Sequence, residues 1–326
     1  MLRAGVTCQM APSTSSQAQS QCRLYTAIST HQIRAQSRPQ KLGWAQGLGR
    51  RSRRSNVTCA AADIVSSVSD VFQDIVRTAP QSHPGWLAGA AINSAVFTLG
   101  YKVLRKGLTP AGVAHSWFLG ASIYSAFGAG GYLLVCLYFI FGTLATKVKL
   151  EQKQREGIAE ARSGQRGPAS VWGSGIAGVA CALAALATGD YRLWQVGFVA
   201  SFASKLSDTV SSEIGKAYGQ TTYLVTTFQR VPRGTEGAVS AEGTAAGVGA
   251  ALAFAAVAVA VGQVSVPGAG AVAGAAIVAN FFESYLGAVV QGRVPWLTND
   301  LVNMTQISVA AALAIAACAA LDLPTP

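Results

Sequence analysis

Long apolar stretches separated by short polar segments make up the chain from about residue 85 onward. A helix that crosses the hydrocarbon core of a bilayer needs roughly 20 mainly apolar residues. The candidate stretches are 86–101, 109–127, 131–146, 169–188, 193–211, 238–262, 268–290 and 304–321. The fifth and seventh carry polar residues, so we predict seven to eight spans. Alternating β patterns are absent. The predicted fold class is therefore all-α, a polytopic transmembrane helical bundle.

The N-terminal segment has a different pattern. Residues 1–62 hold nine Lys and Arg residues but no Asp or Glu, and they lack a continuous apolar core. Such a basic, Ser-rich leader is typical of an organelle transit peptide, and the Val-Thr-Cys-Ala segment at 57–60 is similar to a chloroplast processing site. We predict a disordered chloroplast transit peptide over 1–60, a linker over 61–84 and an integral membrane domain over 85–326. A disordered basic tail that is kept is the alternative.

Composition supports a membrane protein and excludes several kinds of site. Only 12% of the 326 residues are charged, against about 25% in an average soluble domain, and the mean hydropathy is +0.35. The formal net charge of +11 comes mostly from the leader, so it does not indicate a nucleic-acid partner. Three histidines and the absence of a CxxC pair exclude a zinc site or a disulfide framework.

Basic residues are unevenly distributed between the two sides of the predicted bundle. In the eight-span arrangement, thirteen of the sixteen basic residues after residue 62 fall in loops on one side, at 102–108, 147–168, 212–237 and 291–303. By the positive-inside rule, this side faces the compartment of insertion, which in a plastid is the stroma. The charged loop 147–168 is interpreted as mostly solvated.

Ionisable side chains inside membrane spans are costly and usually functional, and their densest group lies at 203–216. Lys205, Asp208 and Lys216 share one helical stripe. Glu213 lies about 140° around the helix from Asp208. Both carboxylates could therefore reach one metal ion only if the helix breaks or a partner helix intervenes. A solvated helix end with a Lys–Asp pair is the alternative.

A second group of charges follows at 230–244, where proline and glycines stop a helix. Ser240 or Thr235 can cap the next apolar helix, which leaves backbone N–H groups and Arg233 facing an anion. Acid, base and glycine together at a helix entry favour phosphate handling. The candidate residues are Arg230, Arg233, Glu236, Ser240 and Glu242. A plain loop is the alternative.

Further polar residues accompany the last two spans and the loop before residue 169. They are Arg166, Asn280, Glu283, Asn299 and Asn303. Single polar residues in spans are often contacts between helices, worth about 0.6 kcal/mol. All of these groups, however, end on the same side of the predicted bundle. We therefore predict one polar site at one membrane face, with carboxylates for a cation and Arg and Lys for phosphates.

Common nucleotide-binding and catalytic motifs do not account for this site. Gly215 and Lys216 are followed by Ala217, so a Walker-type loop is absent. A Gly-x-Gly-x-x-Gly run at 173–178 opens an apolar helix without a preceding strand, and we interpret it as helix packing. A histidine-based triad is also absent.

The segment 207–219, Ser-Asp-Thr-Val-Ser-Ser-Glu-Ile-Gly-Lys-Ala-Tyr-Gly, resembles the plant and algal chloroplast phytyl-phosphate kinases of vitamin E biosynthesis. They belong to a broad polytopic membrane family formerly of unknown function. The resemblance continues through 231–237, 283–288 and 299–303. It implies that residues 85–326 form an integral membrane kinase domain. Such a domain would transfer a phosphoryl group from CTP, or another nucleoside triphosphate, to phytyl monophosphate, and the diphosphate would feed tocopherol and phylloquinone synthesis.

The expected partners are a prenyl monophosphate, a nucleoside triphosphate and the lipid bilayer, and the expected cofactor is Mg²⁺. The expected location is a chloroplast membrane, the envelope in preference to the thylakoid, with the active site facing the stroma. Two other functions stay open. A CTP-dependent cytidylyltransferase of a lipid phosphate needs the same substrates, and a membrane transporter also uses small-residue helices and buried charges.

Residue type and placement give the candidate roles. The catalytic candidates are Lys205, Asp208, Glu213, Arg233 and Glu236, with Asp208 and Glu213 as the metal ligands. The candidates for binding substrate or nucleotide are Arg166, Lys216, Arg230, Ser240, Glu242, Asn280, Glu283, Asn299 and Asn303.

Overall fold

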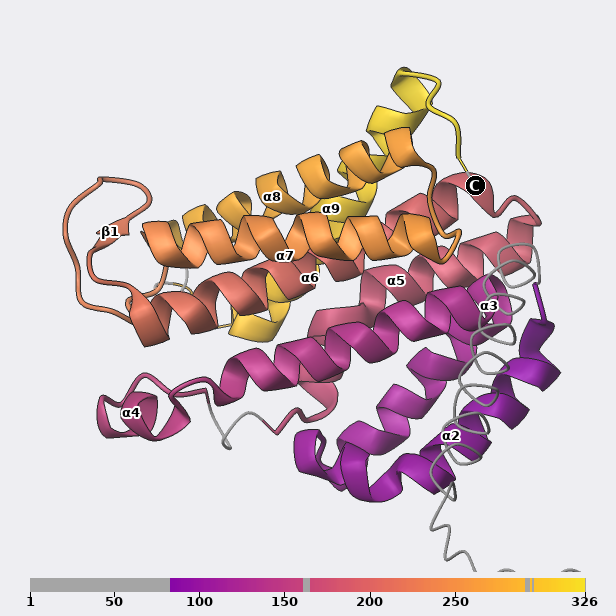
Figure 1. Ribbon diagram of the computed structural model, residues 1–326, viewed down its shortest axis with the longest axis horizontal. Coiled ribbons are helices and arrows are strands. Elements are labelled where there is room, and N and C mark those ends of the chain that lie inside the picture. Colours follow the sequence, from indigo (N-terminus) through magenta and orange to yellow (C-terminus); the bar gives the residue numbers. More distant parts are fainter. Residues whose placement is uncertain (1–82, 161–164, 291–293, 295, 326) are drawn as a thin grey trace, which may run out of the picture. The chain divides into compact units, whose positions relative to one another are not determined.

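The computed structural model describes residues 83–160, 165–290, 294 and 296–325. The predicted transit peptide and nearly all of the predicted linker lie outside these residues. The helices are α2 (Gly85–Gly107), α3 (Pro110–Lys147), α4 (Leu150–Arg155), α5 (Pro168–Thr188), α6 (Arg192–Tyr218), α7 (Ala241–Ala260), α8 (Val266–Val289) and α9 (Asn299–Ala320) (Figure 1). Strands β1 (Thr222–Leu224) and β2 (Ala238–Ser240) pair antiparallel. The helical, polytopic prediction is confirmed.

Helix α3 consists of two segments that meet at Gly128. This residue has φ 62° and ψ −158°, a conformation outside the helical region that a glycine adopts without strain. The two segments correspond to the apolar stretches predicted at 109–127 and 131–146. At the junction, the Gln263 side chain donates to Phe127 O at 3.3 Å, so the chain near the end of α7 packs against this turn.

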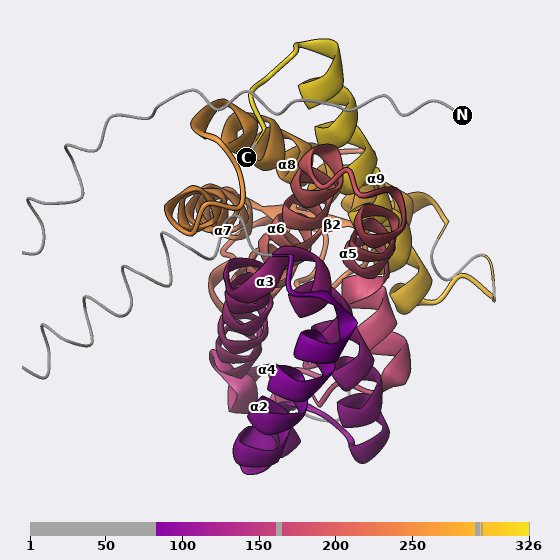
Figure 2. The same cartoon turned by 90° about the vertical axis from the view of Figure 1, so that its right-hand side faces the viewer.

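Six helices are long and apolar enough to cross a membrane, namely α2, α3, α5, α7, α8 and α9. Helix α6 is not among them because charged residues interrupt its second half. It contacts α3, α5, α7, α8 and α9, and Figure 2 shows it in the middle of these helices. The polar helix is therefore shielded by apolar ones, as expected for charges held inside a membrane protein.

Small residues set how closely α6 and α7 approach. A Cβ atom on Gly243 would lie 2.6 Å from Ser211 O, and one on Gly247 would lie 2.9 Å from Ser207 O. Neither position has room for a larger side chain. Such a close approach of two helices is expected where small residues face each other in a membrane protein. In the Gly-x-Gly-x-x-Gly run, a Cβ on Gly178 would lie 2.6 Å from the Phe202 ring. The interpretation of that run as helix packing is confirmed.

The bundle has two different ends. We call one the α4 end, formed by α4, the segment before α5, the hairpin of β1 and β2, and the first turn of α9. We call the other the Gly128 end, formed by the turn in α3, the connection between α5 and α6, and the residues after α7. There His83 stacks on Tyr191 with ring centroids 3.3 Å apart, and its Nδ1 lies 2.8 Å from Ala126 O.

The α4 end differs from the prediction in two respects. The loop 147–168, interpreted as mostly solvated, contains α4, and Lys153 in this helix is fully buried. The reason is an acidic partner from α6, described below. The second difference is the short hairpin, in which Thr222 aligns with Ser240 and Leu224 with Ala238. Three-residue strands are too short to give a detectable alternation of apolar and polar positions.

Candidate functional site

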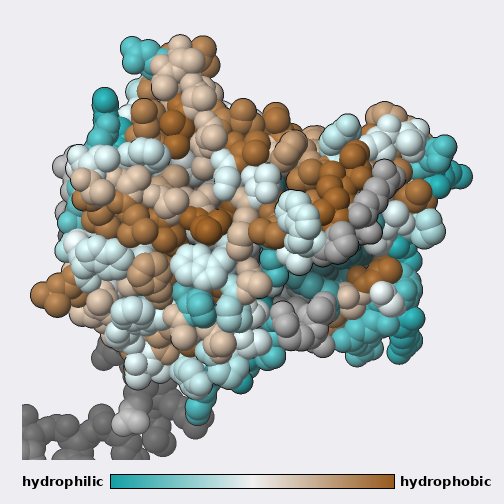
Figure 3. All heavy atoms as spheres, turned by 180° about the vertical axis from the view of Figure 1, so that it is seen from behind, coloured by the Kyte–Doolittle hydropathy of each residue, from teal (hydrophilic) through white to brown (hydrophobic). Residues whose placement is uncertain are grey.

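A polar pocket of about 410 Å³ opens at the α4 end. Its walls come from α5, α6, α8 and α9, from the segment between α4 and α5, and from the hairpin loop with β2. Figure 3 shows hydrophilic residues gathered at this end, whereas apolar residues cover much of the remaining face. The pocket therefore lies where membrane helices meet their polar connections.

Eleven of the fourteen predicted site residues line this pocket. They are Arg166, Lys205, Asp208, Glu213, Lys216, Glu236, Ser240, Asn280, Glu283, Asn299 and Asn303. The convergence of separate sequence segments on one side of the bundle is thus present in the fold. What these residues do chemically is a separate question, which depends on their contacts.

Three predicted residues are not among those that line the pocket. Arg230 is exposed and donates to Thr221 Oγ1 at 3.2 Å. Arg233 pairs with Glu156 at 2.9 Å, and Glu242 accepts from Gln220 N at 3.2 Å. Arg230 and Arg233 belong to the loop between β1 and β2. Thr222 of β1 and residues 234–237 of the same loop line the pocket, but these two arginines do not. That Arg230 and Arg233 bind phosphates stays a prediction; Arg233 also donates to Lys216 O at 3.3 Å, next to the pocket.

Lys205 and Asp208 form a buried ion pair within α6. Lys205 Nζ lies 2.5 Å from Asp208 Oδ2 and donates to Asn303 Oδ1 at 2.9 Å. Their i, i+3 spacing brings the two side chains together on one helix face. The pair considered in the sequence is therefore present, but at 7% and 9% exposure the two residues are not at a solvated helix end.

Glu213 has lysine partners on both carboxylate oxygens. Lys153 Nζ contacts Oε2, and Lys216 Nζ lies 3.6 Å from Oε1. Lys153 also donates to Thr146 O at 2.8 Å, which fixes α4 against the end of α3 and against α6. The sequence gives no signal for Lys153, since α4 is too short to have a readable periodicity.

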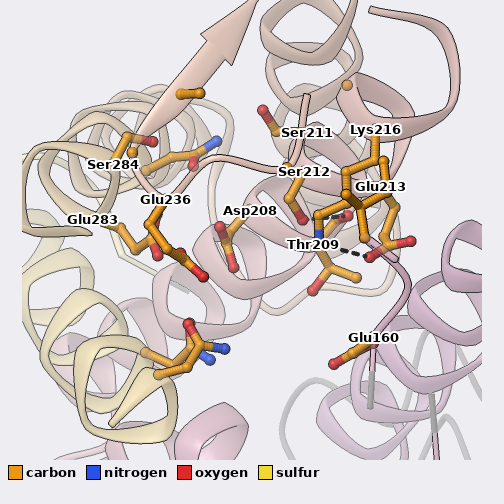
Figure 4. A pocket seen from close by; sticks show the side chains of 18 of the residues that line it. Glu160, Asp208, Thr209, Ser211, Ser212, Glu213, Lys216, Glu236, Glu283 and Ser284 are labelled. Carbon is orange, nitrogen blue, oxygen red and sulfur yellow. Dashed lines mark hydrogen bonds and ion pairs between the residues drawn. The ribbon is translucent and has the colours of Figure 1, made fainter. Parts of the chain in front are cut away.

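Three carboxylates from different elements lie near one another in the pocket. They are Asp208 of α6, Glu236 of the hairpin loop and Glu283 of α8, and Figure 4 shows Glu236 and Glu283 together on one side of Asp208. Glu283 interacts electrostatically with both of the others. Lys205 and Lys216 also contribute to its electrostatic environment. Acidic and basic groups thus both act on Glu283 in the pocket.

The fit of this site to Mg²⁺ depends on what the ion needs. Among the described residues, no group of three or more His, Cys, Asp or Glu side chains has an arrangement ready to hold a metal. Mg²⁺ usually binds through one or two carboxylates, with substrate phosphates and water completing the octahedron. Asp208 with Glu236 or Glu283 fits this requirement. Glu213 fits less well, because both of its oxygens have lysine partners.

Arg166 carries a buried charge at the rim of the pocket. It is 8% exposed, and its Nη1 donates to Tyr138 Oη at 2.6 Å. Its backbone is held by Gly107 O, which accepts from Arg166 N at 2.9 Å, and by Thr109 N, which donates to Arg166 O at 3.0 Å. Within the described part of the chain, no carboxylate forms an ion pair with it. A buried cation without a counter-ion is costly, so this position suits an anionic ligand.

Sequence reasoning missed several residues that line the pocket. Asp300 accepts a hydrogen bond from Ser170 Oγ at 3.2 Å, and Glu160, Thr209 and Ser212 also face the pocket. Asp300 directly follows the predicted Asn299, and Ser212 shares the helical stripe of Asp208. Those two had a usable signal, whereas Glu160 lies in a segment with no periodic pattern.

The family of integral membrane proteins known as DUF92 matches residues 93–311. The chain belongs to this family. All residues that line the pocket fall within the matched range. The site is therefore part of the DUF92 domain and not of the N-terminal leader.

Relatives of this DUF92 protein are found in plants, bacteria and archaea. The chloroplastic protein VTE6 of Arabidopsis thaliana is 45% identical over 270 residues, which cover 81% of this chain and 80% of that protein. An uncharacterized membrane protein of Synechocystis is 48% identical over 232 residues, covering 71% and 90%. An uncharacterized membrane protein of Methanocaldococcus jannaschii is 31% identical over 194 residues, covering 59% and 78%. No solved structure matches the chain.

These similarities confirm the resemblance that the sequence blocks indicated. The match to chloroplastic VTE6, together with six apolar helices, identifies this DUF92 protein as a multi-pass chloroplast membrane protein.

Proposed function

We propose that this DUF92 protein is a phytyl-phosphate kinase of chloroplast vitamin E biosynthesis. It would transfer a phosphoryl group from CTP, or another nucleoside triphosphate, to phytyl monophosphate and release phytyl diphosphate. The observation that supports this proposal most is the pocket at the end of a membrane bundle. Arg166, which is buried and has no carboxylate partner among the described residues, lines it together with three carboxylates. Similarity to VTE6 supports the pathway.

The chemistry needs little from the protein beyond binding and charge. An oxygen of phytyl phosphate attacks the γ-phosphorus of the nucleotide, the bond to the β–γ bridging oxygen breaks, and the nucleoside diphosphate leaves. A phosphate monoester is already anionic near neutral pH, so a general base is not required. The site must instead hold two anions in line and offset their repulsion. The pocket suits this task because its lining combines lysine, arginine and carboxylate side chains, and none of the described residues that line it is a histidine.

The contacts suggest a role for each cation. Arg166 is free to bind the acceptor phosphate, since among the described residues its guanidinium has one hydrogen-bond acceptor, Tyr138 Oη. Lys216 has a side chain that is 27% exposed and would bind the phosphates of the nucleotide. Lys205 is held by Asp208 and Asn303, so its role is to position Asp208.

Asp208 with Glu236 or Glu283 would hold Mg²⁺. When bound, this ion supplies charge neutralisation and Lewis-acid polarisation at the phosphoryl oxygens. We prefer this set to the predicted pair of Asp208 and Glu213, because the lysines on Glu213 compete with a metal. Ser240 caps α7 by accepting from Gly243 N at 3.1 Å. The remaining N–H groups at the start of that helix add a favourable environment for phosphate.

We further propose that the α4 end faces the stroma, in the envelope in preference to the thylakoid. The basic loops predicted on one side of the bundle support this orientation, because they belong to the α4 end. Soluble nucleotide would then reach the pocket directly from the stroma, while the lipid substrate arrives from the bilayer.

The test is an assay of the purified full chain in lipid nanodiscs with phytyl monophosphate, Mg²⁺ and base-labelled CTP. The kinase predicts labelled CDP together with phytyl diphosphate. Pyrophosphate together with a CDP-lipid would instead identify a cytidylyltransferase. Absence of turnover with every triphosphate in a chain that remains folded would contradict both enzymes and favour a transporter.

A matched pair of variants tests the role of Asp208. We expect Asp208→Asn to lower turnover by about 10²–10³-fold, the usual cost of losing a group that stabilises transition-state charge, with a larger loss at limiting Mg²⁺. Asp190→Asn, at an exposed position of the Gly128 end, removes the same charge and should keep full activity. Equal activity of the two variants would remove Asp208 from the site.

A further inference from the structure

An apolar cavity of about 330 Å³ lies next to the polar pocket. Its walls come from α2, from both segments of α3, and from parts of α5 and α6. The lining is almost wholly hydrocarbon and aromatic, as in Leu104, Leu119 and Phe139. Its volume falls in the range of about 300–1,000 Å³ that small-molecule sites occupy. Such a cavity suits an apolar ligand.

Two residues line both this cavity and the polar pocket, namely Arg166 and Ser174. The two spaces therefore meet at the buried guanidinium that has no carboxylate partner among the described residues. A molecule with an anionic head and a long apolar tail matches this arrangement, because its head satisfies Arg166 while its tail leaves water and the polar pocket. Neither the apolar cavity nor the polar pocket alone indicates such a ligand, but their junction at Arg166 does.

One residue of helix α2 that lines the cavity has free space beside it. Gly100 lines the cavity, and a Cβ atom built there meets no other atom within 4 Å. It lies two helical turns before Gly107, which accepts from Arg166 N, and that is about 10 Å along the helix axis. The space beside Gly100 is therefore away from the charged end.

We propose that this apolar cavity binds the isoprenoid tail of the lipid phosphate, and that Gly100 keeps room for a long tail to pass. The proposal rests on the proposed function for the identity of the head group, since it places the phosphate of the acceptor at Arg166. It adds a second site, built from α2 and α3, that selects acceptors by tail length.

Gly100→Leu tests the tail site directly. The new side chain starts in open space, because a Cβ atom at this position meets no other atom within 4 Å. Leucine is also a better helix former than glycine, so the variant should fold. We expect the KM for phytyl monophosphate to rise by about tenfold or more, as expected when a tail loses an apolar pocket. The KM for dimethylallyl monophosphate, whose five-carbon tail ends before Gly100, should stay within about twofold.

Gly249→Leu is the matched control. Gly249 lies on α7, is exposed, lines neither space, and has open surroundings, because a Cβ atom placed on it would meet no other atom within 4 Å. The substitution should leave both KM values unchanged. An unchanged KM for phytyl monophosphate in Gly100→Leu would overturn the tail site. An equal rise for both acceptors would also overturn it, because the substitution would then act on the polar pocket.

A binding experiment separates failure of the tail site from failure of the kinase. The full chain in nanodiscs is irradiated with a phytyl monophosphate that carries a diazirine on its tail, and the labelled residues are located by mass spectrometry. Labels on the cavity walls of α2 and α3 that unlabelled phytyl monophosphate removes, and that phytol does not, would support the tail site even if no turnover occurs. Labels that lie elsewhere, or that phytol and bulk lipid remove equally well, would overturn it.

Discussion

The two ends of the bundle differ in whether they bury ion pairs. At the Gly128 end, Arg192 and Asp190 form an exposed pair at 3.8 Å, with side chains 71% and 54% exposed. At the α4 end, the Lys153–Glu213 and Lys205–Asp208 pairs are buried. The pair at the Gly128 end is thus solvated, whereas the α4 end carries exposed charges such as Arg155 and Arg230 and, in addition, two pairs enclosed by helices.

This difference indicates where the molecule retains charge at a cost. Exposed pairs cost little and contribute about 0–1 kcal/mol, so the pair at the Gly128 end needs no functional explanation. Buried charges carry a large desolvation penalty, and apolar residues would close the α4 end at lower cost. The Gly128 end is closed without buried ion pairs, by the turn at Gly128 and by the hydrogen bond from Gln263 to Phe127 O. The α4 end is therefore better explained by ligand binding than by stability.

The largest expected effect comes from breaking the buried pair that anchors α4. Lys153→Met leaves Glu213 without its buried partner, and we expect the free energy of unfolding to fall by about 3–5 kcal/mol. Arg192→Met at the Gly128 end should change it by less than about 1 kcal/mol. Denaturant unfolding of the purified chains in detergent measures both. The double variant Lys153→Met with Glu213→Leu should recover much of the loss, and failure to recover would show that Lys153 acts through packing and not through charge.

Arg166→Gln should separate function from stability. Turnover should fall by about 10²–10³-fold, because the acceptor phosphate loses its cation. The free energy of unfolding should stay level or rise, since an unpaired buried charge is removed. Arg192→Gln is the control for loss of one guanidinium and should change neither quantity. If the folded fraction of Arg166→Gln fell by as much as its turnover, Arg166 would be a structural residue instead.

Much of the fold could be predicted because each membrane helix leaves a long apolar stretch in the sequence. Each of the eight apolar stretches corresponds to a helix or to one of the two segments that Gly128 separates in α3. The side of the bundle that carries the site also followed from the sequence, since polar residues in different stretches ended at the same side. The sequence alone shows which side chains are charged and where along a predicted helix they lie.

The partners of those charges could not be predicted in the same way. Lys153 reaches Glu213 across sixty residues of sequence, through a short helix that has no periodic pattern. Arg233 pairs with Glu156, 77 residues earlier in the chain, and the three-residue strands that flank its loop leave no readable alternation. Both outcomes depend on how short connections fold at the α4 end, where tertiary contacts and not local sequence decide the conformation.

The smallest expected effect uses two helix caps with the same cap contact, one at each end, although Ser265 Oγ also donates to Pro324 O. Ser240 Oγ accepts from Gly243 N at 3.1 Å at the start of α7, and Ser265 Oγ accepts from Gly268 N at 3.1 Å at the start of α8. Each change to alanine should lower the free energy of unfolding by about 1 kcal/mol. Only Ser240 lines the pocket, so only Ser240→Ala should also raise the KM for the nucleotide, by about two- to tenfold.

The paired caps therefore sharpen the comparison between the ends without disturbing a charge. Equal losses of stability would show that the two serines are equivalent as caps, and the KM for CTP then reports what the α4 end adds. A rise in that KM for Ser265→Ala as well would mean that helix fraying anywhere in the bundle reaches the site. The difference between the ends would then be one of charge alone, and the N-terminus of α7 would have no part in binding phosphate.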